Sequence, residues 1–309
     1  MTADHVLLLG HGTVENLDDL TPFLANIRRG RPAPADLIHE VRRRYQLIGG
    51  SPLLRICREL AGRLEGRLQK PVHLATRFWH PFAKDVLRAV SALGAERLIV
   101  IPLAPYSGDV YESEMRRLAE AQRQEGPLPP DLVCAPNWGS EALLVDAFAS
   151  ALIDALAALP DSRRAAAHVF FSAHSLPLAI VEKGDRYPEE VLATANAVAA
   201  RAGLQNPWRM VYQSQGGTAD PWLGPDVETS LRAAADEGAR DVIFCPIGFL
   251  SDHIEVLYDL DVEAKAWAAA SGITLSRTRS LNAASPIVET IAALVQRLSW
   301  REPLYSAPS

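Results

Sequence analysis

The chain has 309 residues, of which 48% are hydrophobic, so it can bury large cores and exceeds the usual size of one domain. Its formal net charge is -6 and no long basic stripe runs through it, which argues against a nucleic-acid backbone as the main partner. Cys57, Cys134 and Cys245 are widely separated and show no C-x-x-C spacing. We therefore expect reduced packing residues, and neither a disulfide framework nor a zinc or iron–sulfur site.

The N-terminal residues lead directly into an apolar strand, without the charged and hydrophobic regions of a signal peptide. The chain also has no uninterrupted apolar segment of about 18 residues. These observations predict a cytoplasmic protein with no transmembrane segment, for which contact with a membrane surface stays open.

In the first half of the chain, short apolar strands alternate with helical patterns. The first strand begins at Val6 and ends in a glycine-flanked turn that carries His11. The run 98–106 is continuously apolar, which is typical of a strand buried on both faces of a parallel sheet. Further strands are predicted at 72–78 and 132–135, with helices at 17–29, 35–47, 52–68, 82–93 and 110–125. This alternation predicts a doubly wound α/β domain.

The second half repeats this pattern. Residues 94–102 and 238–246 each contain a helix stop, a strand and a final proline, and the strand before His174 corresponds to the strand before His11. We predict two similar α/β domains, 1–150 and 151–309, with parallel sheets facing a central cleft at the strands' carboxyl ends. The second-half strands are expected at 168–173, 209–214, 241–247 and 273–278, and the helices at 140–158, 189–202, 225–237, 254–270 and 286–298.

The helix predicted after Cys245 carries an unusual row of acidic residues. Ser251 and Asp252 have the pattern of a helix N-cap. Beyond them, Glu255, Asp259 and Glu263 fall at i, i+4 and i+8, so an α-helix places three carboxylates on one face, with His253 beside the first. Like charges at this spacing cost roughly a few tenths of a kcal/mol per pair, which favours a functional reason for them. The alternative is a solvated acidic face.

His174 follows a strand and precedes Ser175-Leu-Pro177, a turn that proline stiffens. A histidine at such a place is often a hydrogen-bonded structural residue. A Ser-His-Asp hydrolase is also conceivable, but the chain has no G-x-S-x-G elbow. Histidine and carboxylate without a thiolate suit ferrous iron or another divalent metal that is handled transiently.

Several longer motifs resemble the signatures of the ferrochelatase family, and the similarity spans roughly residues 6 to 298. The motifs are IRRGR (27–31), RY (44–45), IGGSPL (48–53), WHPF (79–82), SAHSLP (172–177), GDRYP (184–188), QSQGGTADPWLGP (213–225) and SDHIEVLY (251–258). The N-terminal motifs and the one around Trp222 are most similar to the soluble bacterial branch that acts on coproporphyrin III.

The resemblance implies two Rossmann-like, chelatase-type domains and a lyase of haem biosynthesis that inserts Fe(II) into a porphyrin and releases two protons. Iron is then a substrate, no prosthetic group or iron–sulfur cluster is expected, and the partners are a porphyrin and ferrous iron. A free-base porphyrin is flat and holds two N–H protons, so metal entry requires the ring to buckle and a base to accept protons. The resemblance makes His174 and Glu255 the metal-site pair, with His174 the favoured proton acceptor. Asp259 and Glu263 would continue a file of carboxylates that passes protons or metal.

The resemblance also assigns residues to the porphyrin itself. Arg28, Arg44, Tyr45 and Ser51 match family positions that hold porphyrin carboxylates, and arginine is well suited to bind a carboxylate with two parallel hydrogen bonds. Trp222 would contact the porphyrin ring, although ordinary core packing explains this tryptophan nearly as well.

The chain departs from the coproporphyrin branch at one informative position. His11 stands where that branch usually has a tyrosine that ligates the product iron. Since imidazole is a competent iron ligand, we hypothesise that His11 is an axial ligand or a second proton carrier, the alternative being a turn histidine bonded to the backbone.

Three other functions stay open at this stage. The substrate of the same enzyme class could be protoporphyrin IX, which has two propionates instead of four. The turn around His11 also resembles cobalt chelatases of corrin synthesis, but the Trp222 region and Arg28-Arg29-Gly30 argue against that family. A haem or porphyrin carrier that does not insert metal would need no line of carboxylates. The family's soluble bacterial members suggest a monomer.

Overall fold

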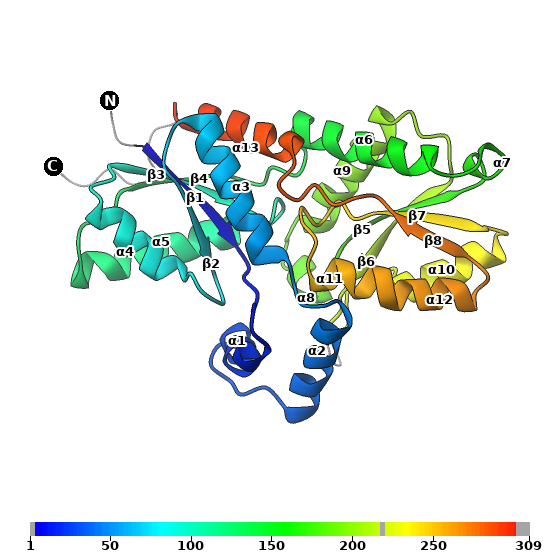
Figure 1. Ribbon diagram of the computed structural model, residues 1–309, viewed down its shortest axis with the longest axis horizontal. Helices are drawn as coiled ribbons and strands as arrows, with labels where there is room; N and C mark the ends of the chain where they lie inside the picture. Colours follow the sequence, from blue (N-terminus) through cyan, green and yellow to red (C-terminus); the bar gives the residue numbers. More distant parts are fainter. Residues whose placement is uncertain (1–3, 217–219, 301–309) are drawn as a thin grey trace. The chain divides into compact units, whose positions relative to one another are not determined.

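The computed structural model describes residues 4–216 and 220–300, so residues 217–219 of the tryptophan motif and 301–309 of the predicted second domain lie outside the described part (Figure 1). The described residues divide into two compact units, one formed by 4–138 and 282–300 and the other by 139–216 and 220–281. Each unit contains one four-stranded sheet in which every pairing is parallel. The α/β fold class predicted from the sequence is confirmed.

The sheet of the first unit has the strand order β2-β1-β3-β4. On one of its faces, Leu7 and Leu9 pack with Leu87, Met115 and other buried residues of α4 and α5. Helices α3 and α13 contact each other and the strands β2 and β3, respectively. The elements are β1 (Asp4–Gly10), η1 (Leu17–Asp19), α1 (Leu20–Ile27), α2 (Ala35–Leu47), α3 (Leu53–Leu68), β2 (Val72–Thr76), α4 (Ala83–Ala92), β3 (Arg97–Pro102), α5 (Gly108–Glu125), β4 (Asp131–Cys134) and α13 (Ser285–Leu298).

The sheet of the second unit has the equivalent order β6-β5-β7-β8, which confirms the repeated pattern seen in the sequence. Phe170, Val242 and Phe244 pack with Leu231 of α10 and with Leu260 in the segment after α11. The elements are α6 (Ala142–Ala157), α7 (Asp161–Arg164), β5 (His168–His174), α8 (Leu178–Val181), α9 (Tyr187–Arg201), β6 (Trp208–Gln213), α10 (Val227–Asp236), β7 (Asp241–Cys245), α11 (Ile254–Leu257), η2 (Asp259–Ala264), α12 (Lys265–Ala270) and β8 (Thr274–Arg277).

The unit boundaries differ from the predicted 1–150 and 151–309. Helix α6 belongs to the second unit, and α13, at the end of the chain, returns to the first unit because its buried face packs against α3 and β3. Nothing in the local pattern of 286–298 indicates this return, since an amphipathic helix fits either sheet equally well.

The structure also bears on the predictions for the cysteines and for a transmembrane segment. Cys57, Cys134 and Cys245 are buried and free, and burial raises the pKa of each thiol to about 12. Across the described ranges, no helix combines the length and apolar character needed to cross a bilayer.

Candidate active site

His174 is the last residue of β5, at the carboxyl end of the sheet of the second unit. The backbone after it is held from three directions. The amide of Ser175 donates to the Gln213 carbonyl at 2.7 Å, the Ser175 hydroxyl donates to the Leu223 carbonyl at 2.7 Å, and the Tyr187 hydroxyl donates to the His174 carbonyl at 2.8 Å. These bonds fix the direction in which the imidazole leaves the strand.

The two nitrogens of the His174 ring have different partners. Nδ1 is hydrogen-bonded to the carbonyl of Ser175, and since a carbonyl only accepts, Nδ1 carries a proton. Nε2 lies 3.5 Å from Oε1 of Glu255, at the start of α11. Burial lowers the pKa of His174, but the charge and hydrogen bond of Glu255 outweigh it. With smaller contributions from the Ser175 carbonyl and Asp259, they raise that pKa to about 9.

The Glu255 carboxylate lies near a second imidazole as well. Nε2 of His253 is 3.8 Å from Oε2 of Glu255, and the His253 ring packs edge-on against Phe249 with centroids 5.1 Å apart. Burial lowers the pKa of His253, and this effect exceeds the opposing charge of Glu255. One carboxylate therefore lies near two imidazoles whose pKa values are shifted in opposite directions.

The acidic segment differs from the single α-helix predicted for 254–270. It consists of the short helix α11 and the helix α12, both labelled in Figure 1, and of the π-helical segment η2 between them. The amide of Glu263 donates to the Tyr258 carbonyl at 3.0 Å, an i to i+5 bond that replaces the α-helical spacing. The predicted cap is also different, because Asp252 contacts Arg277 and Ser280 instead of capping α11.

This change of helix type alters the predicted file of carboxylates. Asp259 is buried, accepts a hydrogen bond from the Ser214 hydroxyl, and contributes to the pKa of His174. Glu263 is half-buried within η2. Of the four residues predicted to bind metal, the structure joins His174 and Glu255 in an ion pair. Within 4–216 and 220–300, no group of three or more His, Cys, Asp or Glu side chains is arranged to hold a metal ion.

In the first unit, His11 is exposed in the turn after β1. Its ring packs against Phe78 with centroids 4.7 Å apart, and its carbonyl accepts from the Phe78 amide at 3.1 Å. Gly12 has a φ of 108°, and a Cβ there would lie 2.9 Å from Oγ1 of Thr76. The turn that presents His11 therefore requires glycine at the following position.

The residues predicted to hold porphyrin carboxylates have different environments. The Nε atom of Arg28 donates to the Pro32 carbonyl at 3.3 Å, and Ser51 Oγ accepts from the amide of Leu53 at 3.4 Å. Tyr45 is only 3% exposed, and its hydroxyl lies 2.9 Å from the Thr13 hydroxyl. In this conformation Tyr45 supports the turn around Thr13 and offers no free hydroxyl at the surface.

Arg44 and its neighbour Arg43 share one carboxylate. The Nε atom of Arg44 lies 2.8 Å from Glu40 Oε1, and the Nε atom of Arg43 lies 2.9 Å from Glu40 Oε2. Hydrogen bonds from these two arginines lower the pKa of Glu40 to about 2. Arg44 is one-third exposed, so its guanidinium is both paired and accessible.

Comparison with known proteins decides the family. Residues 3–298 match the ferrochelatase family. The chain belongs to the ferrochelatase family. A ferrochelatase of Herpetosiphon aurantiacus is 33% identical over 94% of this chain and 97% of its own length. A coproporphyrin III ferrochelatase of Mycobacterium avium is 37% identical over 96% of this chain and 89% of its own.

The solved structures add information on the fold. The sirohydrochlorin chelatase SirB of Bacillus subtilis in complex with cobalt matches 96% of this chain and 95% of its own, with a TM-score of 0.58 and 12% identity. At this identity the match shows the chelatase fold alone. The family assignment makes the chain an enzyme, a lyase-type metal chelatase that inserts iron into a porphyrin, so the carrier alternative is set aside.

Trp222, the predicted ring contact of this ferrochelatase, packs inside the second unit. Pro177 and Trp222 form an antiparallel bridge, and the Leu223 amide donates to the Leu176 carbonyl at 2.8 Å. A Cβ on Gly216 would lie 2.6 Å from the indole, so this ring covers a glycine. Packing thus accounts for part of the Trp222 surface, and the residue as a whole is half-buried.

Two side chains that shape the ferrochelatase site, Gln213 and Ser214, were not predicted from the sequence. Nε2 of Gln213, at the end of β6, donates to the Glu255 carbonyl at 2.5 Å, and Ser214 follows with a φ of 61° and binds Asp259. Gln213 pairs with His174 in the register of β5 and β6. The signal for both was their position at a strand's carboxyl end, one strand away from His174.

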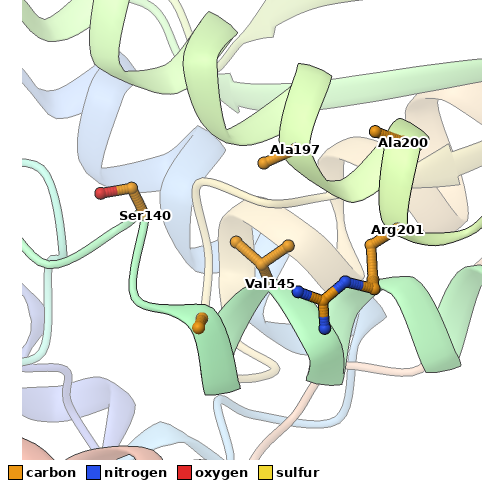
Figure 2. A pocket seen from close by; sticks show the side chains of 6 residues that line it. Ser140, Val145, Ala197, Ala200 and Arg201 are labelled. Atoms are coloured by element: carbon orange, nitrogen blue, oxygen red, sulfur yellow. The ribbon is translucent and has the colours of Figure 1, made fainter.

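A hollow of about 450 Å³ lies between α6 and α9 of the second unit (Figure 2). Its lining is apolar or small except for Arg201, whose guanidinium is paired with Asp146. This hollow contains neither His174 nor a carboxylate of the acidic segment, so its chemistry does not match metal insertion.

Proposed function

We propose that this ferrochelatase metallates coproporphyrin III, with His174 and Glu255 handling the protons and the iron. The pairing of His174 Nε2 with Glu255 Oε1 at 3.5 Å is the observation that carries the catalytic part of this proposal. A basic imidazole next to a carboxylate is what removal of pyrrole protons requires. The same two groups have the nitrogen and oxygen donors that suit a divalent metal bound transiently.

The overall reaction releases two protons for each Fe(II) that enters the ring. In the substrate-free protein, His174 with a pKa of about 9 carries an extra proton at neutral pH. That proton must leave before Nε2 accepts one from a pyrrole nitrogen. Glu255 is the first acceptor, and Asp259, whose charge is felt at His174, continues the route toward solvent. An approaching divalent cation repels the imidazolium proton and favours this transfer.

The preference for coproporphyrin III is supported by cationic groups of the first unit. Arg28 and Arg31 donate through Nε to backbone carbonyls, and Arg44 is accessible although paired with Glu40. Guanidinium groups bind carboxylates with charge-assisted hydrogen bonds. Coproporphyrin III has four propionates and can therefore bind more guanidinium groups than protoporphyrin IX, which has two. Relatives at 35% to 37% identity named coproporphyrin III ferrochelatases support the same branch.

Four further assignments belong to this proposal. Ser51 completes the polar contacts to the propionates, and Trp222 contacts the macrocycle with the part of its ring that stays exposed. His11 ligates the product iron or carries a second proton. The enzyme acts as a monomer, which size-exclusion chromatography with light scattering checks.

The decisive experiment is anaerobic metallation followed by visible absorbance. Purified protein receives Fe(II) with coproporphyrin III or with protoporphyrin IX, and His174→Ala and Glu255→Gln are assayed alongside. We expect selective turnover of coproporphyrin III, and a loss of about a hundredfold or more in both variants. Equal or faster turnover of protoporphyrin IX would assign the other branch, and full activity of His174→Ala would remove its role as proton acceptor.

A further inference from the structure

Arg277, the last residue of β8, binds one aspartate in the loop before the acidic segment and another within η2. Its Nε atom donates to Asp261 Oδ1 at 3.0 Å, and its Nη2 atom donates to Asp261 Oδ2 at 2.8 Å, a two-pronged contact with η2. Nη2 also donates to Asp252 Oδ1 at 3.1 Å, in the loop before α11. The side chain of Arg277 is only 14% exposed, so solvent screens these charges weakly.

The other contacts of Arg277 leave the guanidinium no freedom. Nη1 donates to the Thr278 carbonyl at 3.1 Å and approaches the Ser280 hydroxyl at 3.5 Å. The Ser280 hydroxyl in turn donates to Asp252 Oδ1 at 2.7 Å. A guanidinium has five N–H groups, and each has an acceptor here. The amide of Thr278 donates to the Phe244 carbonyl at 2.8 Å, which anchors this arginine to the sheet.

In the sequence, the two aspartates that Arg277 binds lie on either side of Glu255 and Asp259. Asp252 is three residues before Glu255, and Asp261 is two residues after Asp259. The helix between them has four residues, and a helix this short is not stable by itself. It continues into a π-helix that concentrates like charges, which raises the free energy of the segment further. The position of Glu255 therefore depends on contacts from outside the segment.

We propose that Arg277 is a positioning residue for metal insertion, which holds Glu255 and Asp259 in place through Asp252 and Asp261. This inference rests on the proposed role of Glu255. As a positioning residue, Arg277 acts through the two aspartates that it binds. Its fork joins the loop before α11 and the middle of η2 to the end of β8, and its positive charge offsets the repulsion among the carboxylates.

The second unit offers a matched control at the other end of the same sheet. The Nε atom of Arg163 lies 2.8 Å from Asp241 Oδ2, and its Nη2 atom binds the other oxygen, so this pair is also two-pronged. Asp241 is the first residue of β7 and is buried, but it lies at the amino end of that strand. Breaking either pair removes a comparable arginine–aspartate contact, whereas only the Arg277 pair borders the site.

The test compares Arg277→Met with Arg163→Met in anaerobic metallation of coproporphyrin III and protoporphyrin IX, using whichever the wild type turns over. Both variants lose thermal stability. We expect Arg277→Met to lose at least about tenfold in kcat and to gain in KM for Fe(II), because small displacements of reacting groups are costly. Its KM for the porphyrin stays constant, and Arg163→Met keeps the wild-type kcat.

Two conservative changes separate positioning from general loss of structure. Arg277→Lys keeps the charge but loses the fork, so we expect an activity between those of Arg277→Met and the wild type. Added guanidinium at millimolar concentration should restore part of the activity of Arg277→Ala and none of that of Glu255→Gln. If Arg277→Met does not fold, Asp261→Asn, which keeps the shape of the partner, carries the same comparison.

Failure of the positioning role of Arg277 and failure of the proposed role of Glu255 would give different results. Wild-type kcat in folded Arg277→Met, or an equal loss in Arg163→Met, would overturn the positioning role. If Asp261→Asn is used in place of Arg277→Met, wild-type kcat in Asp261→Asn would likewise overturn the positioning role. Glu255→Gln is assayed in parallel, and full activity of that variant would instead overturn the proposed role of Glu255.

Discussion

Nε2 of His174 lies 3.5 Å from Oε1 of Glu255, which joins the end of a central strand to the first turn of the acidic segment. This pair predicts an imidazole that titrates at about 9 in the substrate-free protein. We expect Glu255→Gln to lower the pKa of His174 toward 6.5, because the largest raising contribution is lost. NMR titration of the imidazole resonances measures this change.

The same shift predicts a pH dependence of stability. The folded-state pKa of His174 is above its unfolded value, so its stabilising contribution is full below pH 6.5 and is lost as the pH rises to about 9. The difference in unfolding free energy between wild type and His174→Gln should therefore shrink between these pH values. A difference that grows across this window would contradict the assignment.

Gly248 predicts a steric requirement next to the site. A Cβ at this position would lie 2.6 Å from Cα of Ala173, one residue before His174. We expect Gly248→Ala to destabilise the fold by about 1–3 kcal/mol through overpacking, and to lower kcat because the end of β5 moves. Chemical denaturation and the metallation assay measure both effects.

Gly62 provides the control for that change. It lies exposed within α3, and a Cβ there meets no atom within 4 Å. Gly62→Ala should stabilise the protein by roughly 0.5 to 1 kcal/mol, since alanine is the better helix former. If Gly248→Ala behaved like Gly62→Ala, the close approach at Ala173 would have no energetic consequence.

The sequence predicts most of the fold, because both halves have the same alternation of apolar strands and amphipathic helices. It also places His174 and the segment that carries Glu255 at the carboxyl ends of strands. Their pairing was implied by the family resemblance, because the strand order does not follow from the sequence. The segment after Tyr258 is different. A π-helix needs one residue more per hydrogen-bonded turn, and the spacing of acidic residues alone fits an α-helix equally well.

The contacts of Arg277 and the burial of Tyr45 were beyond sequence reasoning for another reason. Arg277 is 16 residues from Asp261 and 25 from Asp252, so only the assembled sheet reveals that one guanidinium binds both. Tyr45 is next to an accessible arginine in the sequence, yet α2 turns it toward Thr13. Adjacent residues of a helix point in different directions, and a motif gives no indication of which one is buried.

Separate substitutions of Arg44 and Arg43 test which arginine binds a porphyrin carboxylate. Both pair with Glu40, but only Arg44 matches the predicted porphyrin contact. We expect Arg44→Met to raise KM for coproporphyrin III about tenfold with little change in kcat, because a charge-assisted hydrogen bond is lost in ground state and transition state alike. Arg43→Met is the control and should leave KM unchanged. Equal effects of the two variants would attribute binding to the overall charge of α2.

His11 predicts a spectroscopic signature of the product complex. The imidazole is exposed at the end of β1, and packing against Phe78 restricts its motion. If it ligates the product iron, His11→Ala should change the visible absorption spectrum of the bound iron porphyrin, because the axial ligand determines the electronic state of the iron. His39→Ala, which removes another exposed histidine from α2 of the same unit, should leave the spectrum unchanged. An unchanged spectrum for His11→Ala would eliminate the axial role and leave His11 as a proton carrier or a turn residue.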